Sequence, residues 1–280
     1  MRISTKARMN RMFTNGGCLD VAIDHGVCNE PSFLVGLEDM ASVVNTLVDA
    51  RPDAIQMAYG QADLLQNRPE KDKPALVMRI DMGNPYNDQR HRAMWSMLQN
   101  ADEPIIGALE MDAAAVVVNL FMLPDEPELF HQCVENISRV RAACHKYGMP
   151  LMIEPLVMLP NDVRGGYQVD GNAEKIVTLT RLASEMGADI IKADPTENPE
   201  DFHRVVEAAR VPVLVRGGGK EDLKTVLMKS AALIAQGAQG MVYGRNIYQH
   251  DNPKQVVAAL MAMIHNGASG EEAWEIYQSA

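Results

Sequence analysis

Short apolar runs alternate with longer amphipathic stretches along the whole chain. The runs are nearly continuous in aliphatic residues, which is typical of parallel strands covered by helices on both faces. Their spacing averages roughly 30 residues, the length of a strand–helix unit. The pattern therefore predicts eight strands, at residues 18–23, 54–58, 75–80, 114–121, 151–157, 190–193, 211–215 and 240–243.

Helix signals fall between these runs. The clearest stretches begin with proline or acidic residues or end before glycine, and they cover residues 127–147, 173–186, 199–209, 221–235 and 253–265. Eight strand–helix units in one chain favour a closed (β/α)8 TIM barrel over an open sheet. No linker-like segment divides residues 1–280, so we expect a single domain. The polar segment 81–103 is predicted to be a long loop and is a candidate lid over the active site.

Composition narrows the class of protein. The 280 residues carry a net charge of −11, and no dense basic cluster provides the footprint of a nucleic-acid binder. The longest apolar run, residues 113–123, is too short to span a bilayer, and the four cysteines have no metal-ligand spacing. We expect a soluble cytoplasmic protein without metal or cofactor, acting on a small molecule.

Polar residues stand at or just after the ends of most predicted strands. In a parallel barrel the carboxyl ends of the strands lie on one face, and that face carries the active site. We therefore expect these residues to gather in one site. They are Asp24, His25, Arg79, Asp81, Asn119, Glu154, Lys192, Arg216, Gly217, Gly218, Gly219, Lys220, Gly244, Arg245 and Asn246.

Lys192 is the least expected of them, because it stands within the apolar run Ile190-Ile191-Lys192-Ala193. Burial and nearby positive charge favour a neutral amine, which can attack a carbonyl group. The alternative is a structural lysine that pairs with an inward-facing acid, since lysine is rarely buried without a partner. The residues alone leave both interpretations open.

Glu154 and Asp24 are the predicted proton carriers beside Lys192. Glu154 lies in the middle of a strand, a position that disfavours a turn role, and a structural ion pair with Lys192 or Arg245 is the alternative. Asp24 can also be a turn residue before Gly26. His25 has no partner spaced for metal binding or a catalytic triad, and we place it among the substrate contacts together with Asn119.

Glycines follow the last two predicted strands. The backbone N–H groups of Gly218, Gly219 and Gly244 make a candidate phosphate site, and Arg245 adds a charged contact. A tight turn is the alternative for the triple glycine, which matches neither the Walker A nor the dinucleotide pattern.

Four segments together resemble the DeoC/LacD class I aldolase superfamily. That superfamily includes archaeal-type fructose-bisphosphate, tagatose-bisphosphate and sulfofructosephosphate aldolases and the autoinducer-2 thiolase. The segments are Val21-Ala22-Ile23-Asp24-His25-Gly26, Ile190-Ile191-Lys192, Gly217-Gly218-Gly219-Lys220 and Gly240-Met241-Val242-Tyr243-Gly244-Arg245-Asn246-Ile247-Tyr248-Gln249.

The resemblance implies that Lys192 forms an imine, that Asp24 assists proton transfer, and that the glycines and Arg245 hold a phosphate. Two departures bear on the substrate. Archaeal-type fructose-bisphosphate aldolases have Trp-x-Tyr on strand five, where this chain has Glu154 and Leu156. This pattern is closer to the tagatose-bisphosphate and sulfofructosephosphate aldolases. Arg216 replaces a small residue and indicates an extra anionic group on the substrate.

The sequence-based hypothesis is a Schiff-base-forming aldolase acting on a small phosphorylated ketose or sugar acid. Two alternatives stay open: acyl transfer to coenzyme A through the same lysine, and a non-catalytic protein that binds a sugar phosphate. A metal-dependent aldolase is disfavoured because no ligand set has the required spacing. We also expect a homo-oligomer, with methionine-rich helices at its interfaces.

Overall fold

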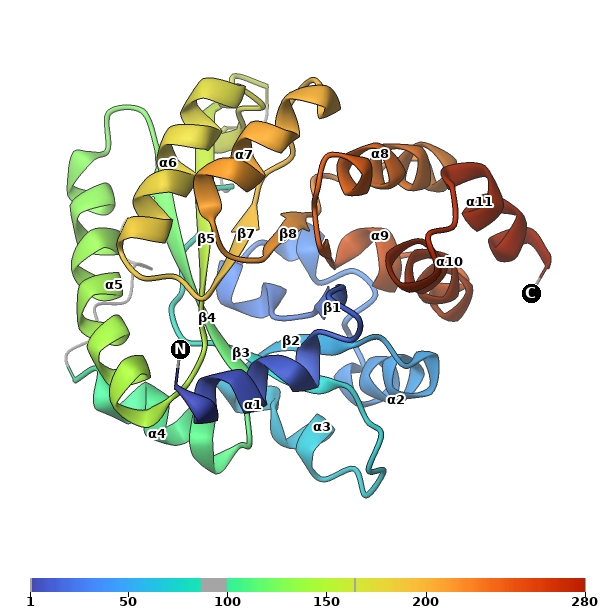
Figure 1. Ribbon diagram of the computed structural model, residues 1–280, viewed down its shortest axis with the longest axis horizontal. Coiled ribbons are helices and arrows are strands. Elements are labelled where there is room, and N and C mark those ends of the chain that lie inside the picture. The colour runs from blue at the N-terminus through green and yellow to red at the C-terminus, as the bar shows by residue number, and fades with distance from the viewer. Residues whose placement is uncertain (1, 87–99, 164, 280) are drawn as a thin grey trace.

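The computed structural model describes residues 2–86, 100–163 and 165–279. Eight parallel strands close into a barrel, since β4 pairs with β5 at the point where an open sheet would have two edges (Figure 1). The predicted (β/α)8 barrel is therefore confirmed. Its strands are β1 Cys18–Ala22, β2 Ala54–Ala58, β3 Ala75–Arg79, β4 Ala115–Met122, β5 Leu151–Pro160, β7 Ile190–Ala193, β8 Val213–Arg216 and β9 Gly240–Tyr243.

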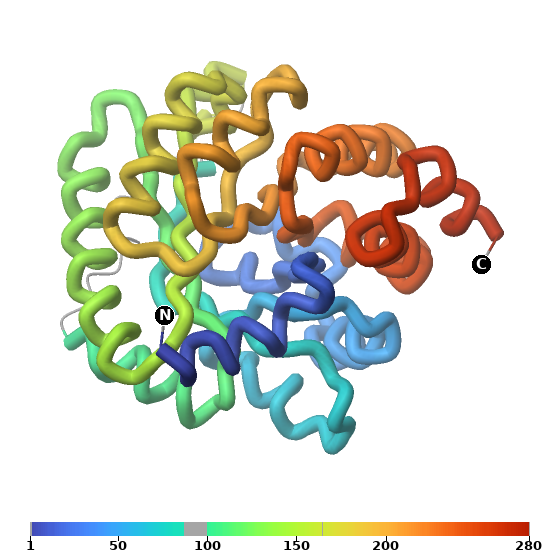
Figure 2. The backbone as a smooth tube through the Cα atoms, in the orientation of Figure 1, coloured from blue at the N-terminus to red at the C-terminus, as the bar shows by residue number. Residues whose placement is uncertain are grey.

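Helices surround the barrel, as Figure 2 shows along the chain. Several ends agree with their glycine signals: α5 is followed by Gly148 at φ 66°, a left-handed conformation that glycine adopts without strain. The helices are α1 Ile3–Met12, α2 Met40–Ala50, α3 Asp63–Gln66, α4 Asp102–Glu110, α5 Pro127–Tyr147, α6 Ala173–Glu185, α7 Phe202–Ala209, α8 Leu223–Ala235, α9 Arg245–Tyr248, α10 Pro253–Asn266 and α11 Gly270–Ser279. No helix among them is both long and apolar enough to cross a membrane.

Some elements lie outside the predicted pattern, among them the short helix α9 after the last strand. The helices α1 and α11 flank the repeating units, and β6 (Tyr167–Val169) pairs antiparallel with the extended end of β5. The predicted loop 81–103 is shortened at its end, because α4 begins at Asp102. Residues 87–99 of that segment lie outside the described residues, so the lid remains a prediction.

The barrel interior has an apolar lower part and a charged upper part. The lower part is filled largely by alanine and valine, and Met9 and Met12 of α1 close it from below. A separate, larger core packs the outward faces of the strands against the helices. Because side chains alternate along a strand, each strand can place aliphatic residues outward and polar residues inward toward the carboxyl end. The charged upper part holds the candidate site.

Candidate active site

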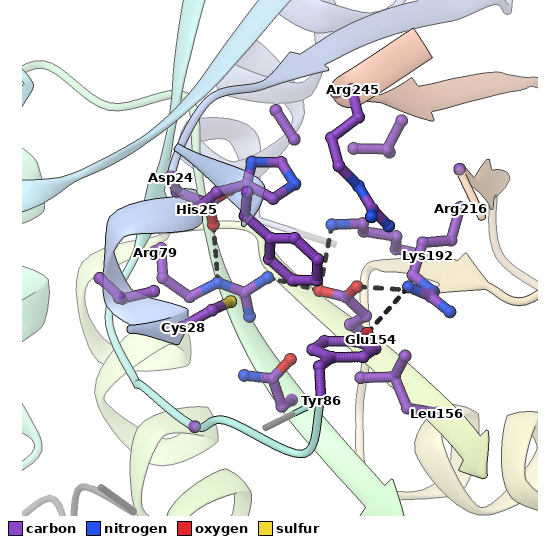
Figure 3. A pocket seen from close by; sticks show the side chains of 18 of the residues that line it. Asp24, His25, Cys28, Arg79, Tyr86, Glu154, Leu156, Lys192, Arg216 and Arg245 are labelled. Atoms are coloured by element: carbon purple, nitrogen blue, oxygen red, sulfur yellow. Dashed lines mark hydrogen bonds and ion pairs between the residues drawn. The ribbon is translucent and has the colours of Figure 1, made fainter. Parts of the chain in front are cut away.

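Lys192 points into the barrel from β7, while its neighbours Ile191 and Ala193 belong to the outer core. Its side chain is buried. The amine Nζ lies 3.1 Å from Glu154 Oε2 and donates a hydrogen bond of 3.3 Å to Gln56 Oε1. Lys192 thus has the acidic partner that the structural interpretation requires, and it also lines a cavity at the barrel mouth (Figure 3).

Arg79 connects the carboxylates around this lysine. From the end of β3, its Nε donates to Asp24 Oδ2 at 2.9 Å and its Nη1 to Asp81 Oδ1 at 3.2 Å, while Nη2 makes a close contact with Glu154 Oε2. The guanidinium is buried, so these ion pairs are poorly screened by water. One arginine therefore joins side chains from three separate parts of the barrel.

The cations hold both predicted proton carriers in their ionised form. Burial alone raises the pKa of Glu154, but Lys192, Arg79 and Arg216 outweigh it and lower that pKa to about 2. For Asp24 burial is likewise outweighed, by Arg79 and Lys192, so its pKa lies below the usual value. A carboxylate that binds protons this weakly is a poor general base near neutral pH. Glu154 is instead placed to stabilise positive charge at Lys192, whose Nζ lies 3.1 Å away.

Hydrogen bonds from amide side chains fix the same cluster. Gln56 on β2 donates to Asp24 Oδ2 at 2.6 Å while it accepts from Lys192. Asn119 on β4 donates its backbone and side-chain N–H groups to Asp81, the backbone bond being 2.7 Å long. Asn119, predicted as a substrate contact, therefore supports Asp81 and also borders the cavity.

Arg216 enters the cavity from the end of β8. Its Nε donates to the buried carboxylate of Asp194, and its Nη1 donates to the hydroxyl of Tyr86 at 3.1 Å. Nη2 is buried and has no hydrogen-bond partner among the described residues. Arg216 therefore retains a donor at the cavity wall, as a contact with an anionic substrate group would require.

The rim of the cavity carries the predicted glycines and Arg245. The guanidinium of Arg245 lies 4.2 Å from the Phe33 ring centre and donates to Gly218 O at 3.1 Å. A Cβ on Gly218 or Gly219 would meet no heavy atom within 4 Å, so the backbone there is open to a ligand. Gly244 is needed for a close approach, because a Cβ would lie 2.6 Å from Ala22 O.

His25 also lines the cavity, and its ring packs edge-on against Phe33 and Tyr248 at centroid distances of 5.7 and 5.4 Å. Burial lowers the pKa of His25 to about 4, with Lys192 and Arg245 adding to the effect, so the imidazole is neutral at physiological pH. This neutrality is compatible with a substrate contact and excludes an imidazolium that donates a proton.

The structure brings the predicted site residues together in one place. All of them border the cavity except Asp81, Gly219 and Lys220. Asp81 is bonded to Arg79 behind the cavity wall, Gly219 borders the adjoining outer groove, and Lys220 donates to Gln249 O. Gln56 and Tyr86 were not among the predicted site residues, and Arg79 was expected in the site without an assigned role. An amide within the apolar run 54–58 and an arginine at the end of 75–80 were the available signals. Tyr86 had none, since it lies in an irregular polar segment.

Asp20 is a buried acid below this cluster. It faces inward from β1, both carboxyl oxygens have no hydrogen-bond partner among the described residues, and no part of the residue is exposed. Burial raises the pKa of Asp20 to about 7, although Lys192 opposes the rise. The folded protein therefore keeps a proton on Asp20 in a pH range where the unfolded chain has lost it.

This difference predicts a pH dependence of stability. Between the ordinary carboxyl pKa of 3.8 and about 7, the folded state binds more protons, so Asp20 makes stability fall as pH rises through this window. Relative to Asp20→Asn, the wild type should lose up to about 4 kcal/mol of unfolding free energy between pH 4 and pH 8. Urea unfolding of both proteins at pH 4 and pH 8 measures this change in unfolding free energy. Asp63→Asn, at an exposed position, is the control; equal pH dependence in wild type and Asp20→Asn contradicts the prediction.

No group of three or more His, Cys, Asp or Glu side chains arranged to hold a metal ion occurs within residues 2–86, 100–163 and 165–279. The groups that line the cavity include a buried amine, ionised carboxylates, a phenol and three arginines. Together they suit covalent chemistry on a carbonyl group in a substrate that carries negative charge.

Comparisons with known proteins agree with this chemistry. The model of the "DeoC/LacD family aldolase" matches residues 18–250. An uncharacterized aldolase of Saccharolobus solfataricus is 31% identical over 276 residues, covering 98% of this chain and 99% of its own. The 3-hydroxy-5-phosphonooxypentane-2,4-dione thiolase of Escherichia coli is 27% identical, covering 98% and 87%.

A solved structure of a Schiff-base-forming fructose-1,6-bisphosphate aldolase shares the fold, with a TM-score of 0.75 and 23% identity over 93% of this chain and all of that one. The family match covers most of the barrel, from the first strand to the short helix that follows the last strand. The chain belongs to the DeoC/LacD aldolase family and is a class I aldolase, a carbon–carbon lyase.

Proposed function

We propose that Lys192 forms a Schiff base with the ketone of a small phosphorylated ketose or sugar acid, and that the imine then promotes cleavage or formation of a carbon–carbon bond. The observation that carries this proposal is the buried amine of Lys192 in the cavity, 3.1 Å from Glu154. An imine at Lys192 is cationic when protonated and draws electrons from the bond that breaks. Glu154 stabilises that charge through its position.

Borohydride trapping tests the covalent step. Wild-type enzyme is incubated with dihydroxyacetone phosphate, fructose 1,6-bisphosphate and other ketose phosphates, then reduced and digested. We expect a mass adduct on Lys192 that identifies the carbonyl half of the substrate. An adduct on another lysine, or turnover with no adduct, contradicts the proposal. Product assays with and without coenzyme A distinguish aldol chemistry from the acyl transfer that the name of the E. coli relative suggests.

We place the phosphate group of the substrate at the rim of the cavity, beside Arg245. Arg245 is half-buried, its cationic side chain makes no salt bridge to a described carboxylate, and it lies beside the open backbone of Gly218 and Gly219. A phosphate there gains charge-assisted hydrogen bonds, and Arg216 adds a second cation on the same wall. The curated relative from E. coli acts on a phosphonooxy compound, which supports a phosphorylated substrate.

Replacing Arg245 by methionine should raise KM for the phosphorylated substrate by about 10- to 100-fold, because one charge-assisted contact contributes about 1.5–3 kcal/mol. The unphosphorylated analogue should show little change in KM. Lys220→Met is the matched control, since Lys220 is an exposed neighbour that donates to Gln249 O. Equal effects of Arg245→Met on both substrates would show that the phosphate does not bind at this position.

A further inference from the structure

Imine chemistry at Lys192 needs a proton donor. The carbinolamine that forms first loses its hydroxyl as water only when a proton reaches that oxygen. Glu154 and Asp24 have no proton to give near neutral pH, because surrounding cations lower the pKa of each. His25 is a neutral imidazole. From β5, the cavity receives the carboxylate of Glu154 and the aliphatic Leu156, with no hydroxyl.

Tyr86 supplies a hydroxyl from another part of the barrel. It follows β3 and lines the same cavity as Lys192 and Glu154 (Figure 3). Its ring packs edge-on against Phe33 at a centroid distance of 5.1 Å, which fixes its orientation. Burial raises the pKa of Tyr86, although Arg216 opposes the rise, so the phenol keeps its proton at neutral pH.

Arg216 prepares this phenol for proton transfer. Its Nη1 donates to the phenol oxygen at 3.1 Å, which leaves the O–H proton for a different acceptor. When that proton leaves, the guanidinium is already in place to stabilise the phenolate. Asp194 holds Arg216 in this position through Nε. The pair thus combines a proton that is present at rest with a favourable site for the charge that its loss creates.

We propose that Tyr86 is the general acid and base of the reaction, a role that rests on imine formation at Lys192. The phenol protonates the carbinolamine hydroxyl; the C–O bond breaks, water leaves, and the nitrogen lone pair forms the iminium. The phenolate then takes the proton of the substrate's β-hydroxyl. The electrons of that O–H bond form the aldehyde C=O, and the cleaved C–C pair moves into the iminium to give an enamine. Tyr86 is a phenol again.

Tyr86→Phe tests this role because it removes one oxygen and keeps the ring on Phe33. The ketose phosphate that gives the strongest adduct in the trapping screen serves as substrate. We expect kcat to fall by about 10²- to 10⁴-fold with KM little changed, and the Lys192 adduct to form correspondingly more slowly. The matched control is Tyr147→Phe at the end of α5, whose hydroxyl donates to Asp102 Oδ2; it should keep wild-type kcat.

The outcomes separate the two proposals. Wild-type turnover in Tyr86→Phe, with a normal Lys192 adduct, overturns the role of Tyr86 and leaves the Schiff base intact. An increase in KM at unchanged kcat also overturns it, because it shows that Tyr86 only binds substrate. Absence of the Lys192 adduct in the wild type overturns the Schiff base itself, and the role of Tyr86 with it.

Discussion

Lys192→Met should reduce turnover by about 10⁴-fold or more and abolish borohydride-dependent labelling, because none of the other described residues that line the cavity carries an amine. The substitution keeps the length of the side chain and removes one charge from the cluster. Glu154 keeps its contacts with Arg79 and Arg216, so we expect the variant to fold. Steady-state rates and intact mass after reduction are the measurements.

Lys192→Arg tests whether the reaction needs the covalent bond to Lys192 or only a positive charge at that position. An arginine preserves a cation beside Glu154 but forms no imine with a ketone. It should be as inactive as Lys192→Met while being closer to the wild type in stability. Substantial turnover in Lys192→Arg would show that the positive charge, and not the covalent bond, matters at this position.

Arg79→Met should lower the free energy of unfolding by about 3–5 kcal/mol at pH 7, because it leaves buried carboxylates without their shared cation. The loss should be smaller at pH 5, since the pKa values of Asp24 and Glu154 rise once Arg79 is absent and the carboxylates take up protons. Urea unfolding at the two pH values measures both effects, and activity should be lost as well.

The control for Arg79 is Arg181→Met, which breaks an exposed pair with Glu185 on α6. Such surface pairs contribute about 0–1 kcal/mol. If Arg79→Met costs no more than Arg181→Met, the cluster is not held together by Arg79. Arg79→Lys keeps the charge but cannot form the three contacts at once, and should fall between wild type and Arg79→Met.

The barrel was predictable because most of its strands are short apolar runs in the sequence. Runs such as 211–215 and 240–243 are apolar on both faces, and their spacing excludes most other folds. The exact ends were less predictable: β5 continues to Pro160 because it pairs with β6, a contact between residues that no local pattern reveals. The helix α1 was missed because its apolar face covers the barrel floor, which becomes a surface only after the strands close.

For the site, the polar residues at the strand ends gave the positions of the side chains but not their protonation states. Glu154 in an apolar strand indicated a buried acid, and the structure adds Arg79 from a strand far away in the sequence. The pKa of about 2 follows from that juxtaposition. Tyr86 illustrates the same limit, because its contact with Arg216 joins positions 130 residues apart. Metal independence, location in the cell and oligomeric state remain predictions.

The two levels of the cavity should evolve at different speeds. At the base of the cavity, Arg79 binds three carboxylates at once. A substitution at any one of these positions leaves its partners without a contact, so tolerated substitutions must occur together. On the rim, Gly218 and Gly219 have free space beside them, and single substitutions there disturb little of the barrel. Laboratory selection for new substrates should therefore enrich rim variants first, while the floor sequence persists.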